Sequence, residues 1–386
     1  MYMALWQTKR QKLITSTVVG FAVTLVAVAS VYAYNAYSDR VGTASPHQKN
    51  TSSETQPTDK AAKNSEDAPA ATAKKETQAK PSSPKPVTTT PPPSTSAAPS
   101  PSSPAPASSE SGCTQAGTGQ GGYPLPNLVG RANECNTGPR YACTTTQGTL
   151  VTSYHGQVID RVCINGTLEI RHNNVTVRDV LVMGTGSYAL DIGQNTAICP
   201  SNLRVEYTEI NMTNAGNMDW GIYQRCAGGH VFDHITVLYA GRGMMTYGNL
   251  TLNQSYIYSN RTETGAHRTA FSTHGGTNFT ITGNTLICVN TGCSSSLNIY
   301  SDYAPATNVL IQGNLVAGGS ICMRGGETHA YATQTRDIRV LNNRFSTVYA
   351  PECGTLQAFA QFDESAPGNV RSGNVYYESG LPIPGE

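Results

Sequence analysis

Residues 248–259 read GNLTLNQSYIYS, residues 277–288 read TNFTITGNTLIC and residues 307–318 read TNVLIQGNLVAG. Each stretch begins with a turn residue, continues with apolar residues at alternate positions, pauses at a small residue or Asn, and then alternates again. Alternation with a period of two is typical of β-strands, and Gly and Asn are typical of the turns between them. Each stretch therefore predicts two short strands joined by a tight turn.

The same pattern recurs along most of the second half of the chain. When the first apolar residue of each copy is taken as an anchor, successive anchors lie 28, 28, 19, 29, 30, 29 and 32 residues apart. These anchors are Val175, Leu203, Val231, Leu250, Phe279, Val309, Ile338 and Val370. Short strands with this spacing favour a parallel β-helix, in which each repeat forms one coil and alternate residues fill a narrow core. Propeller blades are longer, at about 40–45 residues.

The chain before the repeats begins with a short basic segment, residues 1–13, followed by ITSTVVGFAVTLVAVASVYAY at residues 14–34. This apolar stretch is long enough to cross roughly 30 Å of hydrocarbon as a helix, and the basic residues before it place the N-terminus in the cytoplasm. The sequence predicts a single-pass protein of the cell membrane with its bulk outside. If a signal peptidase cleaves after Ala33, the protein is secreted instead.

Residues 35–112 consist largely of Ser, Thr, Ala, Pro and Lys and include the run TTTPPPSTSAAPSPSSPAPASS. Too few large apolar residues are present to form a core, and Pro-rich chain of this kind favours the extended polyproline II conformation. We therefore expect a disordered stalk, followed by a folded domain over residues 113–386.

All ten cysteines follow the apolar segment, and an even number in an exported domain favours disulfide bonds. Neither a clustered Cys/His spacing nor an acidic loop of calcium-binding spacing occurs, so no metal site and no cofactor are predicted. Pairing neighbours in order would close short loops, with Cys288 and Cys293 as the first expected pair. The ten residues are Cys113, Cys135, Cys143, Cys163, Cys199, Cys226, Cys288, Cys293, Cys322 and Cys353.

The globular half resembles the secreted bacterial right-handed parallel β-helix repeat proteins of the pectin-lyase-like superfamily. The resemblance covers about Cys143 to Val375 and rests on stretches such as VIDRVCINGTLEIRHNNVTVRDV at 158–180, SDYAPATNVLIQGNLVAGGSICMRGG at 301–326 and QFDESAPGNVRSGNVYYESG at 361–380. It implies an all-β, single-stranded right-handed parallel β-helix and carbohydrate as the partner. The superfamily includes polysaccharide lyases, inverting glycoside hydrolases, epimerases and non-catalytic adhesins. Motifs of its well-known enzyme branches are not found, so the resemblance selects no activity.

Two carboxylates share one offset from the anchors, because Asp302 lies seven residues before Val309 and Asp363 lies seven residues before Val370. Equal offsets should stack in one column of the coil. With one coil between them, the two carboxylates are expected about 9–10 Å apart. That separation borders the range of inverting glycosidases, which hold two carboxyl groups about 6.5–9.5 Å apart.

Strand alternation adds further polar residues to the same outer face, while Phe271, Ile299 and Phe362 should point inward. The candidate catalytic residues are Asp302, Asp363 and Arg268, and the candidate substrate-binding residues are Tyr300, Asn298, His274, Arg324 and Gln361.

Three interpretations of this face remain open. A hydrolase would use the two aspartates as acid and base. A lyase would use Arg268 or Arg324 to neutralise a uronate and His274, His329 or Tyr300 to abstract the adjacent proton. The aspartates could also form structural ion pairs with these arginines.

Taken together, these features predict a membrane-anchored extracytoplasmic β-helix protein that engages polysaccharide. Two alternatives stay open, namely a polysaccharide-degrading hydrolase or lyase, and a non-catalytic adhesin or structural surface protein. Trp220 and Tyr223 are expected near a turn where they could stack on a sugar ring. The formal net charge of +1 gives no reason to expect nucleic acid as a partner.

Overall fold

The computed structural model describes residues 123–386, apart from 194–198, 217–218, 263–264, 266 and 327–329. The basic segment 1–13, the apolar segment 14–34, the stalk 35–112 and Cys113 lie outside the described residues. Among the described residues, no helix is both long and apolar enough to cross a membrane.

The described chain is all-β, with 28 strands and one short 3-10 turn at Ala332–Gln334. Its strands form three sheets in which every neighbouring pair of strands is parallel, which we call sheets I, II and III. Sheet I contains β1 Thr145–Gln147, β4 Val162–Asn165, β7 Leu181–Met183, β10 Glu209–Asn211, β13 Thr236–Leu238, β16 Tyr256–Ser259, β19 Thr285–Cys288, β22 Leu315–Ala317, β25 Arg344–Ser346 and β28 Val375–Tyr376.

Sheet II contains β2 Leu150–Val151, β5 Leu168–Ile170, β8 Tyr188–Ile192, β11 Trp220–Gln224, β14 Arg242–Thr246, β17 Arg268–His274, β20 Cys293–Tyr300, β23 Ile321–Gly325 and β26 Gln357–Ala360. Sheet III contains β3 Val158–Asp160, β6 Thr176–Arg178, β9 Arg204–Glu206, β12 His230–Asp233, β15 Leu250–Asn253, β18 Gly276–Thr282, β21 Ala306–Gln312, β24 Arg336–Leu341 and β27 Val370–Ser372.

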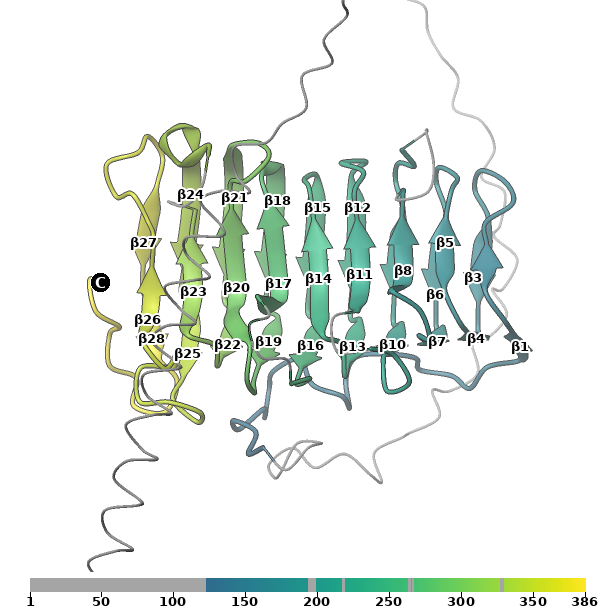
Figure 1. The fold of residues 1–386 in the computed structure, drawn as a ribbon, viewed down its shortest axis with the longest axis horizontal. Helices are drawn as coiled ribbons and strands as arrows, with labels where there is room; N and C mark the ends of the chain where they lie inside the picture. The colour runs from purple at the N-terminus through teal and green to yellow at the C-terminus, as the bar shows by residue number, and fades with distance from the viewer. Residues whose placement is uncertain (1–122, 194–198, 217–218, 263–264, 266, 327–329) are drawn as a thin grey trace, which may run out of the picture. The chain divides into compact units, whose positions relative to one another are not determined.

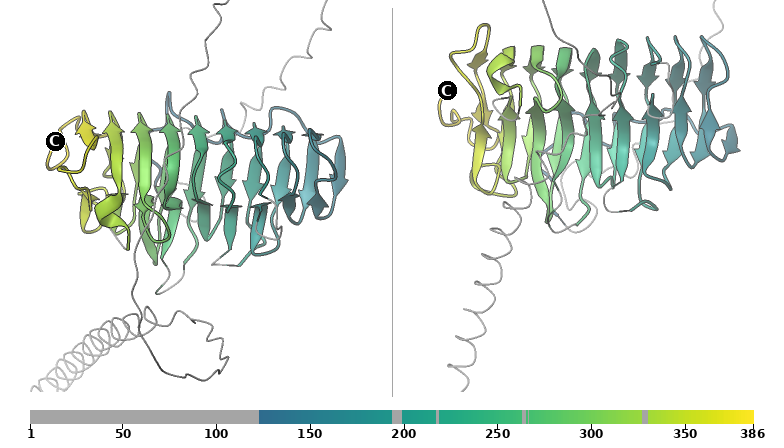
Figure 2. Two further views of the ribbon diagram at one scale, coloured as in Figure 1. Left: turned by 90° about the horizontal axis from the view of Figure 1, so that it is seen from above. Right: turned by 45° about the horizontal axis from the view of Figure 1, so that its top comes forward.

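Strand order within the sheets reveals a stack of coils. Neighbours in each sheet differ by three in strand number, so each coil contributes one strand to each sheet before the next coil begins. Figures 1 and 2 show these coils side by side along the long axis of the domain. This stacking is of the parallel β-helix type that the 30-residue repeat predicts.

Alternate side chains of all three sheets meet in one continuous core. Leu250, Phe279, Val309 and Ile338 lie opposite one another in sheet III, and each is at most 2% exposed. Phe271 and Ile299 of sheet II are also fully buried in this core, which confirms their predicted inward orientation.

Two of the eight sequence anchors are wrong by one residue. Leu250 lies opposite His230, not Val231, so His230 occupies the core position of its coil and is only 1% exposed. Because successive side chains of a strand point to opposite faces, a slip of one residue moves Val231 to the outer face. The anchor was taken as the first apolar residue of the repeat, so the polar His230 in the core position was passed over.

The last anchor is displaced in the same way. Val370 lies opposite Arg339 on the outer face of sheet III and is 47% exposed, whereas the anchor Val309 is fully buried. The position seven residues before Val370 is therefore not equivalent to the position seven residues before Val309. The equal-offset argument for Asp302 and Asp363 loses its geometric basis.

Asn residues occupy the turns, as the sequence predicts, and they form hydrogen-bonded ladders from coil to coil. An outer ladder runs from Asn249 through Asn278 to Asn308, with amide-to-carbonyl distances of 2.7 Å at each step. All three have a left-handed backbone, with φ of 44°, 62° and 52°, which Asn tolerates better than most residues.

A second Asn ladder is fully buried at the start of the sheet I strands. Asn284, Asn314, Asn343 and Asn374 each accept hydrogen bonds from the preceding coil and donate to a backbone carbonyl of that same coil. The carboxylate of the C-terminal Glu386 accepts hydrogen bonds from Asn374 and closes the ladder.

Every cysteine in the described residues is oxidised. Four bonds join neighbouring cysteines in order, including the predicted Cys288–Cys293 pair, and Cys135 is disulfide-bonded as well. The four pairs are Cys143–Cys163, Cys199–Cys226, Cys288–Cys293 and Cys322–Cys353.

Residues 123–140, which we call the strap, lie against the outer face of sheet I before the first coil begins. Leu128 of the strap is buried in a second apolar cluster with Tyr256 and Tyr258 of β16. The Tyr377 hydroxyl donates to Asn127 O over 2.6 Å near the last coil. At the other end of the strap, Arg140 forms an ion pair with Asp179, which directly follows β6 in an early coil. The periodicity of the repeats gives no signal for this covering segment.

Candidate functional site

The outer face of sheet II carries a row of aromatic side chains from successive coils. Tyr188, Trp220 and Arg242 lie opposite one another on β8, β11 and β14. The ring of Tyr223 lies 4.6 Å from that of Tyr188 and 5.7 Å from that of Trp220, measured between centroids. The Arg242 guanidinium lies 4.7 Å from the centre of the Trp220 ring, which is within the range of a cation–π contact.

Tyr247, directly after β14, extends this row toward the end of sheet II. Its ring centroid is 6.0 Å from both His274 and Tyr303. Burial and a hydrogen bond with Tyr223 raise the pKa of the Tyr247 hydroxyl well above its ordinary value. We call Tyr188, Trp220, Tyr223, Tyr247 and Tyr303 the aromatic platform.

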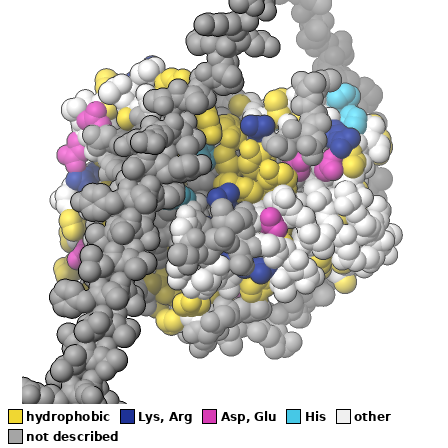
Figure 3. All heavy atoms as spheres, in the orientation of Figure 1, with side chains coloured by type: hydrophobic (Ala, Val, Ile, Leu, Met, Phe, Trp, Pro, Cys, Tyr) yellow, Lys and Arg dark blue, Asp and Glu magenta, His cyan; other side chains and the backbone are white. Residues whose placement is uncertain are grey.

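Figure 3 shows this face in the orientation of Figure 1. Hydrophobic side chains gather over β11 and β14 in the middle of sheet II, with Lys or Arg and Asp or Glu side chains around them. Asp191 lies on β8 and is 3% exposed. Burial, Tyr223 and Asp191 together raise the pKa of the Tyr188 hydroxyl.

At the end of β17, the Nδ1 atom of His274 forms a short hydrogen bond with Oδ2 of Asp302. Asp302 follows β20, the strand of the next coil. The two side chains are 19% and 22% exposed. When Nδ1 carries the shared proton, Nε2 of His274 is an unprotonated acceptor, which is the arrangement that a general base requires.

Tyr300 connects this pair to the next coils. Its ring centroid lies 5.6 Å from that of His274. Burial raises the pKa of the Tyr300 hydroxyl, Asp302 raises it further, and both Arg324 and a hydrogen bond with Asn298 lower it. Tyr300 thus lies near His274 of the preceding coil through its ring, and its hydroxyl is influenced by Arg324 of the following coil.

Arg324 and Gln361 are held together by a hydrogen bond of 2.8 Å from Nη1 to Oε1. Nε of Arg324 also donates to the Ser295 hydroxyl over 3.0 Å. Asn298 is fully buried and lies opposite Arg324 across the β20–β23 pair. All five predicted substrate-binding residues, with Asp302, therefore form one connected group on the outer side of sheet II.

The other two candidate catalytic residues are placed differently. Arg268 is fully buried, and its Nη2 donates to the backbone carbonyls of Val289 and Thr291. Asp363 lies in the loop after β26, where hydrogen bonds from the Ser365 hydroxyl and backbone N–H lower its pKa. Glu327 and His329 lie outside the described residues.

Sequence reasoning missed Tyr188, Arg242, Tyr247 and Tyr303 as members of this face. Tyr188 and Arg242 hold the same coil position as Trp220, which the sequence did single out. Irregular coil lengths prevented their alignment, because the chain between β8 and β11 is longer than that between β11 and β14.

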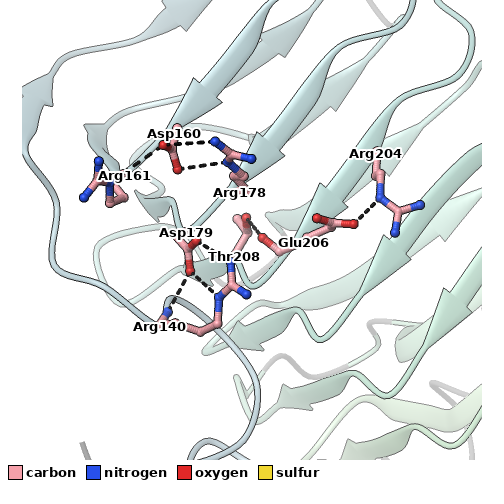
Figure 4. A network of polar contacts seen from close by, with 8 residues as sticks. All are labelled: Arg140, Asp160, Arg161, Arg178, Asp179, Arg204, Glu206 and Thr208. Atoms are coloured by element: carbon pink, nitrogen blue, oxygen red, sulfur yellow. Dashed lines mark hydrogen bonds and ion pairs between the residues drawn. The ribbon is translucent and has the colours of Figure 1, made fainter. Parts of the chain in front are cut away.

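Charged side chains of the first coils form a separate network that is internally paired. Figure 4 shows Arg140 of the strap reaching Asp179, with an Nη2-to-Oδ2 distance of 2.7 Å. Arg178 pairs with Asp160 of the preceding coil over 3.2 Å. Since these charges are already partnered, this network anchors the strap and offers less to a ligand than sheet II does.

No group of three or more His, Cys, Asp or Glu side chains is placed to hold a metal ion in the part of the chain that the structure describes. No family model, curated protein or solved structure matches the chain. The candidate site is therefore interpreted from its own geometry.

Proposed function

We propose that the protein is a membrane-anchored, extracytoplasmic right-handed parallel β-helix that engages polysaccharide on the outer face of sheet II. The aromatic platform carries this proposal. Tyr and Trp combine a flat apolar ring, which suits the C–H face of a sugar, with a polar group that hydrogen-bonds its hydroxyls. Platform residues come from successive coils, so they are spaced along the axis and suit an extended chain.

The location and handedness have separate support. Disulfides persist in oxidising compartments outside the cytoplasm, and every described cysteine is bonded. Residues 14–34 have the length and the flanking charges of a membrane anchor. Crossovers between parallel strands are right-handed in about 98% of cases, which favours a right-handed coil.

A glycan array probed with the full-length protein tests the proposal. Trp220→Ala and Tyr247→Ala should each weaken binding to the glycans that wild type retains by about tenfold or more. The matched control is Tyr154→Ala, because Tyr154 is also an exposed tyrosine, at 59%, but lies in the turn between β2 and β3. Equal binding by all three variants and the wild type would contradict the proposal.

An enzyme acting on the bound polysaccharide is the second candidate, and the His274–Asp302 hydrogen bond favours it. In a lyase, Nε2 of His274 would take the proton beside a uronate carboxylate. Arg324, which lies close enough to Tyr300 to lower the pKa of its hydroxyl, would neutralise that carboxylate. Incubation with candidate polymers separates the possibilities. New reducing ends with an unsaturated product indicate a lyase, new reducing ends without one indicate a hydrolase, and unchanged polymer indicates a binding protein.

A further inference from the structure

A cavity of about 560 Å³ lies at the corner between sheets I and II, away from the aromatic platform. Its walls are the loops that connect β19 to β20, β22 to β23 and β25 to β26 in three successive coils, together with the first strap residues, Tyr123 and Pro124. Cys293 and Tyr300 are the two ends of β20. The cavity and the His274–Asp302 pair are therefore separated by roughly the length of that strand, about 23 Å.

Disulfide bonds fix two of the cavity walls. Cys288–Cys293 closes the first loop on itself, and Cys322–Cys353 ties the second coil to the third. Cys288, Cys293 and Cys353 all line the cavity. These covalent links restrict the first loop by itself and the third loop relative to the coil before it, so much of the cavity wall is preformed.

Backbone conformation at the cavity departs from the regular turns of the coil. Most left-handed non-glycine residues recur at the same two corners in coil after coil. Four others lie elsewhere, namely Tyr239, Asn290, Cys353 and Gln361, and φ is 80° at Asn290 and 63° at Cys353. Asn290 and Cys353 both line this cavity. Asn tolerates this conformation, but at Cys353 a left-handed backbone is strained, and such strain is concentrated at functional sites.

Gly318, Gly319 and the buried side chain of Arg268 also shape the loops that line the cavity. A Cβ on Gly318 would lie 2.1 Å from Cys288 O, and one on Gly319 would lie 2.6 Å from Ser295 Cα, so neither position has room for a side chain. Behind the first loop, Arg268 donates to the carbonyls of Val289 and Thr291 and holds that loop in place. This gives Arg268 a positioning role at the cavity.

The chemistry of the lining identifies the class of ligand. None of the lining residues is charged, so neither an anion nor a cation is favoured over a neutral molecule. Tyr, Val and Pro side chains supply apolar walls. Six side chains carry an amide or a hydroxyl group, namely Tyr123, Asn290, Thr291, Ser320, Tyr349 and Thr355. The volume falls within the roughly 300–1,000 Å³ of small-molecule sites.

We infer that this corner cavity is a second binding site, which accepts an uncharged sugar unit. Apolar walls would contact the ring, and the surrounding hydroxyl and amide groups would bond its hydroxyls. The inference stands independently of the function proposed for sheet II, because the two sites share no residue.

Binding of methyl glycosides of neutral hexoses and N-acetylhexosamines to the full-length protein tests the inference, with methyl glucuronide as the charged counterpart. Titration calorimetry or ligand-observed NMR should detect at least one neutral glycoside that binds at least tenfold more tightly than the glucuronide. Ala350→Trp places a large ring in the cavity and should weaken that binding at least tenfold. Thr355→Trp does the same from the exposed rim, in case Ala350→Trp fails to fold.

Two controls distinguish this site from the sheet II face. Ala227→Trp adds the same ring at an exposed turn and should leave binding unchanged. Trp220→Ala damages the aromatic platform and should also leave this binding unchanged. The inference is wrong if no neutral glycoside binds, if the charged one binds as well, or if both filling variants bind as wild type does. Loss of binding in Trp220→Ala alone would assign the sugar to sheet II.

Discussion

His274 and Asp302 come from successive coils, 28 residues apart, and share a hydrogen bond between Nδ1 and Oδ2. Their side chains are about one-fifth exposed, so a ligand on sheet II can reach them. The side-chain carboxylate of Asp363, the other candidate, accepts hydrogen bonds from the backbone N–H and the hydroxyl of Ser365, which belongs to the same loop. The two aspartates that looked equivalent in the sequence therefore have different surroundings.

Because of this difference, Asp363→Asn is a matched control for Asp302→Asn. If the protein degrades polysaccharide, Asp302→Asn should lower turnover by about 100-fold or more, because the imidazole loses the carboxylate that orients it. Asp363→Asn removes the same charge from an exposed loop and should leave turnover within about twofold. Initial rates on the degraded polymer measure both. Equal losses in the two variants would argue against a special role for His274 and Asp302.

The buried Asn ladder should contribute more to stability than the outer ladder. Asn314→Ala leaves buried polar groups of Asn284 and Asn343 without the hydrogen bonds that the Asn314 amide makes with them. This loss should lower the free energy of unfolding by about 3 kcal/mol. Asn278→Ala removes one rung of the exposed ladder, where water replaces the lost bonds, and should cost about 1 kcal/mol or less. Urea unfolding monitored by circular dichroism compares the two. A larger loss for Asn278→Ala would reject this ranking.

His230 should make the domain less stable in acid. Burial lowers its pKa to about 4, and both ring nitrogens are engaged, Nδ1 with the Leu203 N–H and Nε2 with the Cys226 carbonyl. In the unfolded chain its pKa is about 6.5. Between these values the unfolded chain binds a proton that the folded chain excludes. Its contribution to stability is therefore complete above about pH 6.5 and is lost as the pH falls toward 4, by at most about 1.4 kcal/mol per pH unit.

Unfolding free energies measured from pH 7 to pH 4 test this dependence. His230→Gln should flatten the curve over that interval, even if its stability at pH 7 is lower. His172→Gln, at a partly exposed histidine, should keep the wild-type slope. A wild-type slope in His230→Gln would show that other groups cause the acid sensitivity.

The two disulfides at the corner cavity should differ in their contributions to stability. Cys288–Cys293 spans 5 residues and Cys322–Cys353 spans 31. In the chain-entropy model these bonds stabilise the fold by about 2 and about 3.7 kcal/mol. Replacing each pair by two alanines and measuring thermal unfolding should give the larger loss for Cys322–Cys353. The opposite order would mean that native contacts of the short loop outweigh loop closure.

Several features of the site could be predicted from local sequence. The set Tyr300, Asn298, His274, Arg324 and Gln361 was predicted on one face, and the structure connects its members through a ring contact, hydrogen bonds and strand register. Alternation along a strand sets the face on which each residue lies, and that rule needs no knowledge of distant residues. Arg268 was assigned to the same face by the same rule, but the structure buries it beneath the loop that contains Val289 and Thr291.

The sequence by itself determined the strand content, the coil repeat, the Asn turns and the short Cys288–Cys293 loop, because each depends on residues close together in the chain. Only the tertiary structure decided how the coils register on one another. His230 replaces Val231 in the core, and Val370 lies on the outer face, since turns of unequal length shift one coil against the next. A shift of one residue reverses every side chain of a strand, so the meeting of His274 with Asp302 and the docking of the strap follow from long-range packing alone.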